Sequence, residues 1–198
     1  AWIVSGYAQK SSIINNGPYK GKTLRYLWRE HPELFGSIAY EEPEFPVLIK
    51  LISSSEDLSI QVHPDDEYAL KNENSLGKFE CWYVLDGNEA KTVTLGTKVK
   101  NKFELESLIK QKLYNEFLYE QAINPGDLVI VNPGTVHALH KNSFVLEIQE
   151  SSDVTYRLYD YDRIPKRDLH IDKSMDVIKY NDPSNNIFSF KENSTFKN

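Results

Sequence analysis

Apolar and polar side chains alternate along Leu58-Ser59-Ile60-Gln61-Val62-His63. Successive side chains of a β-strand point to opposite faces, so this period of two predicts a strand. Ser59, Gln61 and His63 share the polar face, which would line the interior of a closed sheet. Polar groups that point inward are unfavourable unless a partner satisfies them. The segment therefore predicts both a strand and a polar site inside the fold.

Short strands are predicted on both sides of this segment. The apolar, β-branched run at 46–52 precedes it, and further strands are expected at about 79–85, 91–95, 119–123, 128–132, 144–149 and 154–160. Several are separated by the turn segments Asp86-Gly87-Asn88, Pro125-Gly126-Asp127 and Pro133-Gly134. Short strands joined in this way predict a mainly β sandwich or barrel, and an aromatic share of 12% suits strands.

Helices are expected to be few and short. Thr23 can cap a helix that runs to about Phe35, and Pro64-Asp65-Asp66-Glu67 begins a second helix that runs to about Lys71. Residues 103–118 carry apolar side chains at helical spacing. From about Asn181 the chain is polar, which predicts a frayed end.

The bulk composition limits the class of protein. The chain has 198 residues, enough for one medium domain, and a net charge of −6. This charge argues against nucleic acid or an anionic membrane as the main partner, although a few local cations can still bind an anionic substrate. No apolar run could span a bilayer, and the N-terminus lacks the layout of a signal peptide. The single cysteine, Cys81, leaves no intrachain disulfide, so a cytoplasmic location is expected.

Glu80 and His137 join Gln61 and His63 as candidate metal ligands. Glu80 lies in the strand at 79–85 among apolar and aromatic neighbours, where an unpartnered carboxylate is unfavourable. His137 begins the strand after the Pro-Gly turn. Each residue alone would more often be a hydrogen-bonded interior group, but together they offer two imidazoles, a carboxylate and an amide oxygen. Zinc suits this mixed set, and manganese, cobalt and iron are alternatives.

Three cationic side chains are expected near these ligands. Lys50 interrupts an apolar run, and Lys78 lies two residues before Glu80 on the same face of its strand. Arg157 lies on a strand whose neighbouring side chains point the other way. Inward cations beside a metal indicate a site for an anion. The other histidines, which are His31, His140 and His170, are assigned to surface or packing roles.

Four segments resemble type I phosphomannose isomerase, the mannose-6-phosphate isomerase family, in its short bacterial form. They cover residues 58–66, 77–85, 133–139 and 147–163. Weaker similarity at 2–5, 17–36 and 167–180 extends the resemblance over most of the chain. Residues 126–137 also resemble the second conserved segment of cupin barrels, in which a turn places a histidine opposite the first metal-binding pair.

The resemblance implies a cupin jelly-roll barrel, mainly β with a few short helices, that interconverts mannose 6-phosphate and fructose 6-phosphate. It implies one zinc ion per chain, bound by Gln61, His63, Glu80 and His137. It also implies that Arg157 is an active-site residue. Lys50 and Lys78 would line the pocket of a phosphosugar substrate, and the list of expected substrate-binding residues is Lys50, Ser59, Lys78 and Arg157.

The resemblance implies an enediol or enediolate intermediate, whose negative charge a metal and a guanidinium can stabilise. The residue that moves the proton stays open. Glu147 alternates with Val145 and Gln149 in a strand, and Lys78 is a plausible acid/base partner if its pKa is depressed. The acidic residues 65–67 are further candidates, but acids are also favourable in the first turn of a solvated helix.

Two alternatives remain open on the same barrel. One is a non-catalytic cupin that binds a sugar phosphate and keeps its metal for structure. The other is a metal-dependent oxygenase, against which the glutamine ligand and the lysine pair argue.

The expected domain organisation is a cupin catalytic domain at 1–180 followed by a polar tail at 181–198. The resemblance implies upstream strands and a second, smaller β-domain that this sequence does not include. Missing strands would leave an open sheet edge, which a partner chain could cover, so a homo-oligomer is possible.

Overall fold

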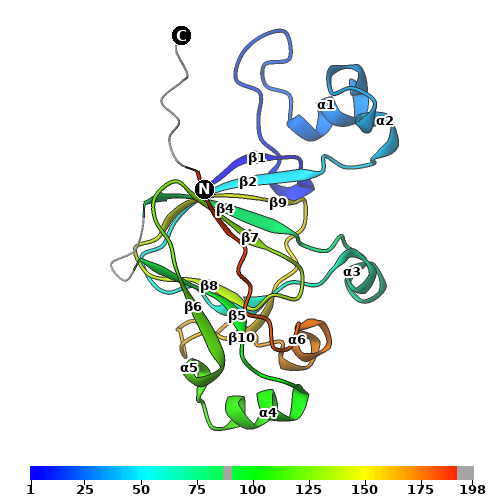
Figure 1. Cartoon of the computed structure of the whole chain (residues 1–198). Coiled ribbons are helices and arrows are strands. Elements are labelled where there is room, and N and C mark those ends of the chain that lie inside the picture. Colours follow the sequence, from blue (N-terminus) through cyan, green and yellow to red (C-terminus); the bar gives the residue numbers. More distant parts are fainter. Residues whose placement is uncertain (87–90, 191–198) are drawn as a thin grey trace.

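The structure is a computed structural model, and it describes residues 1–86 and 91–190. The strands in this part of the chain are β1 (Trp2–Ser5), β2 (Val47–Ser53), β3 (Ile60–Val62), β4 (Glu80–Asp86), β5 (Thr92–Thr97), β6 (Leu118–Ala122), β7 (Asp127–Val131), β8 (His137–Leu139), β9 (Phe144–Glu150), β10 (Tyr156–Tyr159) and β11 (Ile187–Ser189). They form two antiparallel sheets that face each other as the walls of a barrel (Figure 1). The larger sheet has the order β1-β2-β9-β4-β7-β11, and the smaller has the order β10-β3-β8-β5-β6. This double-sheet jelly roll confirms the predicted mainly β, cupin-type fold.

The described helices are short and lie outside the barrel (Figure 1). They are α1 (Leu24–Glu30), α2 (Ile38–Glu41), α3 (Asp66–Glu73), α4 (Lys102–Lys110), α5 (Tyr114–Phe117) and α6 (Ile171–Val177). None of them is both long and apolar enough to cross a membrane.

Two of the predicted helices differ in extent from the observed ones. Thr23 caps α1 as predicted, because its Oγ1 accepts a hydrogen bond from the Tyr26 amide at 3.1 Å. The helix nevertheless ends at Glu30, and a separate 3-10 turn follows at Pro32–Leu34, since proline disfavours helical conformation in the residue before it. The predicted helix at 103–118 is divided into α4 and α5, with Lys112 between them in the left-handed region at φ 58°.

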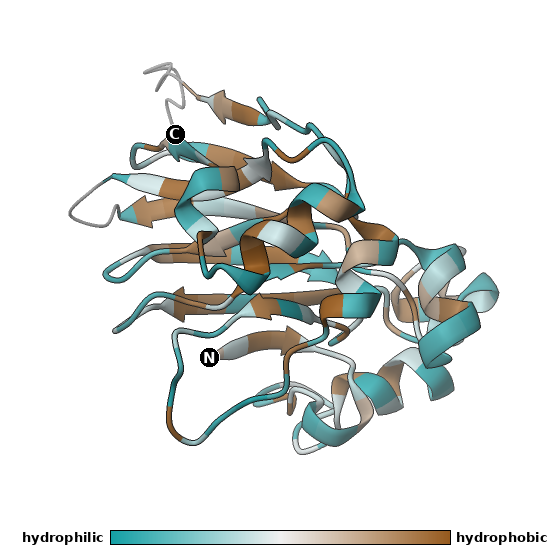
Figure 2. Cartoon of the chain, turned by 90° about the horizontal axis from the view of Figure 1, so that it is seen from below, coloured by the Kyte–Doolittle hydropathy of each residue, from teal (hydrophilic) through white to brown (hydrophobic). Residues whose placement is uncertain are grey.

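Apart from a cluster that packs strands β3, β8 and β10 against helices α4, α5 and α6, the apolar core lies between the two sheets. Its buried side chains come from strands of both sheets and from one connection, and they are Trp82, Val84, Val93, Leu95, Ile123, Val129, Val131, Leu139 and Val145. Figure 2 shows hydrophobic residues recurring along the strands, while the peripheral helices mix both kinds of residue. The inward positions of the strands therefore carry the core that the alternating pattern predicts.

The predicted frayed end from Asn181 is wrong for the part that the structure describes. Residues 187–189 form β11, which pairs with β7 at one edge of the larger sheet. Asp182 and Thr97 exchange two backbone hydrogen bonds of 2.8 and 2.9 Å. Backbone pairing of this kind does not need apolar side chains, which is why the polar composition misled the prediction. The rest of the predicted tail, 191–198, and the turn residues 87 and 88 lie outside the described residues.

Candidate metal centre

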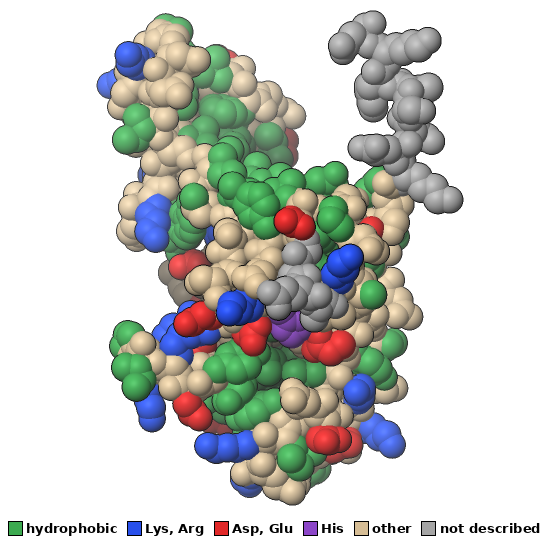
Figure 3. Space-filling model, turned by 90° about the vertical axis from the view of Figure 1, so that its left-hand side faces the viewer, with side chains coloured by type: hydrophobic (Ala, Val, Ile, Leu, Met, Phe, Trp, Pro, Cys, Tyr) green, Lys and Arg blue, Asp and Glu red, His purple; other side chains and the backbone are tan. Residues whose placement is uncertain are grey.

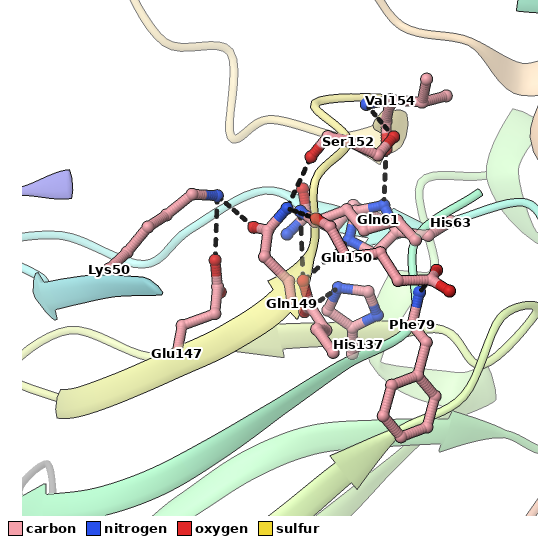
Figure 4. A network of polar contacts seen from close by, with 12 residues as sticks. Lys50, Gln61, His63, Phe79, His137, Glu147, Gln149, Glu150, Ser152 and Val154 are labelled. Carbon is pink, nitrogen blue, oxygen red and sulfur yellow. Dashed lines mark hydrogen bonds and ion pairs between the residues drawn. The ribbon is translucent and has the colours of Figure 1, made fainter. Parts of the chain in front are cut away.

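Both sheets contribute side chains to one buried site between them (Figure 4). In the smaller sheet, Gln61 of β3 pairs directly with His137 at the start of β8, so their side chains lie on the same face. His63 follows β3 immediately. Glu80 begins β4 in the larger sheet. The structure thus brings together the candidate ligands that the sequence places 76 residues apart at most (137 − 61).

Three of these side chains turn their free atoms toward one point. His63 Nε2 lies 3.5 Å from Glu80 Oε2, and His137 Nε2 lies 3.4 Å from Glu80 Oε1. One ligand atom from each residue lies within 4.8 Å of the others. All three side chains are at most 1% exposed. Within the described part of the chain, both imidazole nitrogens and both carboxylate oxygens lack a hydrogen-bond partner.

The other nitrogen of each imidazole is fixed by a backbone carbonyl. His63 Nδ1 lies 2.9 Å from the Val154 oxygen, and His137 Nδ1 lies 2.9 Å from the Thr135 oxygen. A carbonyl oxygen only accepts, so Nδ1 carries the proton in both rings and Nε2 presents a lone pair. Burial lowers the pKa of His63 to about 3 and also lowers the pKa of His137, so both rings are neutral.

The centre is therefore a buried cluster of acceptors that face one another. Burial alone would raise the pKa of Glu80, but the pKa lies well below its ordinary value, and the charge of Lys78 is the largest cause of this lowering. Two imidazole lone pairs and an ionised carboxylate satisfy one another only through a cation, and this donor set fits a divalent metal such as zinc. Carbonyl-anchored histidines are also the usual outer support of a metal site. Gln61 can add an amide oxygen, and its Oε1 has the Ser59 hydroxyl 3.5 Å away.

Lys78 lies at the rim of this cluster. Its Nζ forms an ion pair with Glu80 Oε2 at 3.1 Å, off the direction of a good hydrogen bond, and the side chain is 5% exposed. Burial lowers the pKa of Lys78, but the charges of Glu80 and Glu147 outweigh burial and raise the pKa above its ordinary value. The charges around Lys78 therefore favour its protonated form, whereas an acid/base role would need a depressed pKa.

Glu147 and Lys50 form a second buried pair on the larger sheet. They are register partners across β2 and β9, and Lys50 Nζ lies 2.9 Å from Glu147 Oε1. The Trp82 indole donates a hydrogen bond of 3.1 Å to Glu147 Oε2. Burial and the charge of Glu80 raise the pKa of Glu147 against the opposing effect of Lys78 and Lys50. A raised pKa makes a carboxylate a stronger base, which suits proton transfer.

Gln149 is a polar residue of this site that the sequence analysis does not select. It lies between Leu48 and Glu80 in the register of the larger sheet and is 2% exposed. Its Oε1 accepts a hydrogen bond from Lys50, and its Nε2 donates 2.5 Å to the Ser152 oxygen (Figure 4). Its alternation with Glu147 along the strand was the available signal, because i and i+2 share a face.

Arg157 lies on β10 directly opposite Gln61, so the two side chains share a face of the smaller sheet. Its Nε is buried and lacks a hydrogen-bond partner among the described residues. An orphaned guanidinium nitrogen beside candidate metal ligands is suited to an anionic group of a ligand.

Two of the acidic residues at the start of α3, Asp65 and Asp66, have structural partners instead. Asp65 Oδ1 caps the helix by accepting the Tyr68 amide at 2.9 Å, and Asp66 Oδ1 accepts the Gly77 amide at 2.7 Å. The histidines outside the centre also have other contacts. His31 Nδ1 lies 3.1 Å from Glu33 Oε1, and His140 Nε2 lies 2.7 Å from Glu120 Oε2.

Comparison with known proteins gives a consistent result. Residues 1–103 match the family model described as phosphomannose isomerase type I, catalytic domain. The chain is 48% identical over 182 residues to "Probable mannose-6-phosphate isomerase GmuF" of Bacillus subtilis, covering 89% of this chain and 57% of that protein. It is 42% identical over 188 residues to the mannose-6-phosphate isomerase of Streptococcus mutans, covering 93% of this chain and 59% of that protein. The chain thus spans somewhat more than half the length of these relatives.

The fold is also similar to solved structures. The crystal structure of the mannose 6-phosphate isomerase from Bacillus subtilis superposes with a TM-score of 0.86 at 45% identity, covering 90% of this chain and 58% of that one. A mannose 6-phosphate isomerase described as holo and zinc bound has a TM-score of 0.65 at 15% identity, covering 90% of this chain and 65% of that one, which shows likeness of fold alone.

Proposed function

Because the chain belongs to the type I phosphomannose isomerase family, we propose that it is a metal-dependent aldose–ketose isomerase that interconverts mannose 6-phosphate and fructose 6-phosphate. The observation that carries this proposal is the acceptor cluster of His63, Glu80 and His137. It lies beside Lys78 and next to the pair of Lys50 and Glu147. Together these groups offer a metal site, cations for an anionic substrate and a protonatable carboxyl group within one interior.

Zinc is the metal that we propose, at one ion per chain, with Gln61, His63, Glu80 and His137 as its ligands. Neutral imidazoles and a carboxylate suit zinc, and the zinc-bound isomerase of similar fold supports the choice. The bound ion would supply Lewis-acid polarisation of the sugar oxygens next to the reacting carbons.

The proposed reaction moves one proton between neighbouring carbons. A carboxylate removes the proton from C2 of the open-chain aldose, the enediolate forms, and the proton returns at C1 while a hydroxyl proton passes from O2 to O1. Glu147 is our candidate for this carboxylate, since its pKa is raised and Trp82 and Lys50 fix its orientation. The guanidinium of Arg157 would stabilise the negative charge of the enediolate.

The remaining cations are proposed to bind the substrate. Lys50 and Lys78 are buried or nearly so, with side chains 13% and 5% exposed, and each already faces a carboxylate. Ser59 is 4% exposed and lies two residues before Gln61. Such buried donors favour an anionic, hydroxylated ligand, which a phosphosugar is.

The test measures the metal content and the isomerase activity of the same purified chain. The purified chain is expected to contain about one zinc ion and to form fructose 6-phosphate from mannose 6-phosphate, and a chelator is expected to abolish this activity. Replacement Arg157→Ala is expected to lower kcat by about 100-fold or more, as loss of one charge-stabilising donor does. The control is Arg29→Ala, whose guanidinium is paired with Glu44 at the surface and which should leave kcat unchanged.

Bound zinc without turnover would contradict the isomerase and favour the non-catalytic sugar-phosphate-binding alternative. Turnover of a different sugar phosphate would instead redirect the substrate. A cytoplasmic location and self-association stay predictions, which fractionation of cells and light scattering of the purified chain would test.

A further inference from the structure

Arg157 lies in β10, a strand that has a hydrogen-bonded neighbouring strand on one side. In the described part of the chain, β10 is at the end of the smaller sheet and pairs there with β3. The register of this pair shifts immediately after Arg157, between Arg157 and Tyr159. An irregular ladder on one side is a weak constraint on the direction of a side chain.

His170 occupies the open edge of β10 at this residue. Its backbone amide donates a hydrogen bond of 2.8 Å to the Arg157 carbonyl oxygen. The Arg157 amide donates in turn to His170 Nδ1 at 3.3 Å. Both main-chain groups of Arg157 are therefore bound by one residue, in the way that a neighbouring strand would bind them.

This contact requires one particular form of the imidazole. An acceptor at Nδ1 has no proton there, so the ring is neutral with its proton on Nε2. Burial and the charge of Arg157 lower the pKa of His170, which agrees with a neutral ring. The Ser174 amide donates 2.8 Å to the His170 oxygen, so the residue is also tied to the first turn of α6.

The loop that leads to His170 is anchored at its beginning. Asp160 is 5% exposed and accepts hydrogen bonds from Arg167 Nε at 2.7 Å and from Arg163 Nη1 at 3.3 Å. Arg163 Nη2 donates 2.5 Å to the oxygen of Asp57, in the segment that precedes β3. These hydrogen bonds anchor the loop between β10 and His170 to Asp160 and to the segment before β3.

We propose that His170 is a positioning residue for the isomerase reaction: its neutral Nδ1 and its main-chain amide hold the Arg157 backbone so that the guanidinium points into the metal centre. This inference rests on the proposed function and adds a residue to it. A displacement of about 1 Å at a reacting group can lower a rate by about 100-fold, so the positioning contact is expected to affect kcat.

The test is a double-mutant cycle between His170→Leu and Arg157→Ala. Leucine is of similar size and removes the acceptor. His170→Leu alone is expected to lower kcat about 10- to 100-fold with KM within about threefold and zinc content unchanged. In the Arg157→Ala background, the same change is expected to have no further effect on kcat, since there is no guanidinium to position. His31→Leu is the matched control, because that histidine contacts Glu33 and lies outside the centre.

Two outcomes of the cycle would overturn the proposal. One is a kcat for His170→Leu equal to that of the unmodified chain. The other is an equal loss of kcat with and without Arg157, which would mean that His170 acts through general packing. Melting temperatures of all variants separate these outcomes from partial unfolding.

A second readout does not depend on turnover. In the ¹⁵N NMR spectrum, His170 is expected to show an unprotonated Nδ1, and the Arg157 amide resonance is expected to shift strongly in His170→Leu but not in His31→Leu. If the unmodified chain has no activity while these signals behave as expected, the proposed function fails and the contact stands. A protonated Nδ1 or an unshifted Arg157 amide would contradict the positioning role itself.

Discussion

Glu80 and Glu147 are two buried carboxylates whose surroundings separate their pKa values. Burial raises the pKa of each, and for Glu147 the nearby charge of Glu80 acts in the same direction. For Glu80, the pKa is lowered in spite of burial, and the charge of Lys78 is the largest cause. Glu80 is thus suited to bind a cation permanently, and Glu147 is suited to exchange a proton. Neighbouring carboxylates with opposed environments are a common basis for acid/base assignments in enzymes.

The replacement Glu147→Gln tests this division at the level of one residue. It keeps the shape of the side chain and a hydrogen-bond acceptor for Trp82, but it removes the proton-transfer group. We expect kcat to fall about 10²- to 10⁴-fold, the range for loss of a general base. Zinc content, measured by elemental analysis, should stay near one per chain, because Glu147 is not among the converging ligands. An unchanged kcat would remove Glu147 from the reaction.

Elements of the barrel are held in place by contacts that sequence spacing does not reveal. β5 is an example, because residues 182–184 cross it closely. Gly96 in β5 has φ 98°, and a Cβ added to it would lie 2.2 Å from the Asp182 carbonyl oxygen. Gly126, in the turn before β7, has a similar φ of 91° but nothing within 4 Å of such a Cβ.

Substitution of these two glycines separates the effect of an unfavourable backbone conformation from the effect of a clash with the neighbouring segment. Gly126→Ala is expected to destabilise the fold by about 1–2 kcal/mol, since a left-handed conformation is unfavourable for alanine. Gly96→Ala is expected to have a larger effect, because the chain at Asp182 must also move. Denaturant unfolding of the two variants measures the difference. Equal losses of stability would mean that the 182–184 segment does not approach β5 in solution.

β6 is joined to the end of β8 by a histidine–carboxylate pair. His140 Nε2 lies 2.7 Å from Glu120 Oε2, and Thr94 Oγ1 donates 2.6 Å to Glu120 Oε1. The hydrogen bond with Glu120 raises the pKa of His140, and Asp57 acts in the same direction. Burial alone would raise the pKa of Glu120, but the bonds from His140 and Thr94 lower it.

These shifts predict how the contribution of the pair to stability depends on pH. Because the pKa of His140 is raised on folding, its stabilisation of the fold is fully present below the ordinary histidine pKa of 6.5. This stabilisation is lost as pH rises through the pKa of the folded state. Because the pKa of Glu120 is lowered on folding, its stabilisation of the fold is fully present above the ordinary glutamate pKa of 4.5. This stabilisation is lost as pH falls through the pKa of the folded state. The contribution is therefore fully present between these two ordinary values.

The variant His140→Gln should reproduce this window. Its melting temperature is expected to fall short of that of the unmodified chain by a few degrees at about pH 5.5, and the difference should shrink at about pH 8.5. The effect is limited to about 1 kcal/mol, because the Glu120 side chain is 47% exposed and solvent screens the pair. A difference that grows with pH would contradict the ion pair.

At the scale of the whole molecule, the metal centre joins the two walls of the barrel. Glu80 comes from the larger sheet, while His63 and His137 come from the segments of the smaller one. A cation bound between them would therefore link both sheets. On the face shown in Figure 3, acidic and basic side chains are interleaved on the surface. In the interior, Lys50 and Lys78 likewise each face a carboxylate.

Metal binding is thus expected to stabilise the whole fold. Zinc at about 100 times its Kd should add about 2.7 kcal/mol to the free energy of unfolding, which raises the melting temperature by roughly 5–10 °C for a chain of this size. Calorimetry of the chelator-treated chain with and without added zinc measures the shift. In Glu80→Gln, which loses the carboxylate of the centre, zinc should have little effect. An equal shift in this variant would place the metal elsewhere.

Much of the fold and of the candidate site could be predicted from the periodicity of the side chains and from residue type. Alternation of side chains located the buried strands, because the pleat of a strand sends every second residue to the same face. The same rule placed Gln61 and His63 together and put Glu147 and Gln149 on one face of β9. Residue type then indicated a metal, since inward carboxylate and imidazole groups require a partner. The family resemblance narrowed the expected metal to zinc and added a sugar phosphate as the expected substrate.

The tertiary structure decided what depends on contacts between distant segments. Only the packing of the two sheets brings Glu80 to the imidazoles, and only the carbonyl oxygens of Val154 and Thr135 orient the rings. The pKa values of Lys78 and Glu147 shift because of neighbours far apart in the chain. The contact of His170 with the edge of β10 and the pairing of β11 with the edge of β7 were not predicted, because both depend on backbone hydrogen bonds between distant segments. Backbone hydrogen bonds join groups that every residue carries, so amino-acid type does not reveal where they form.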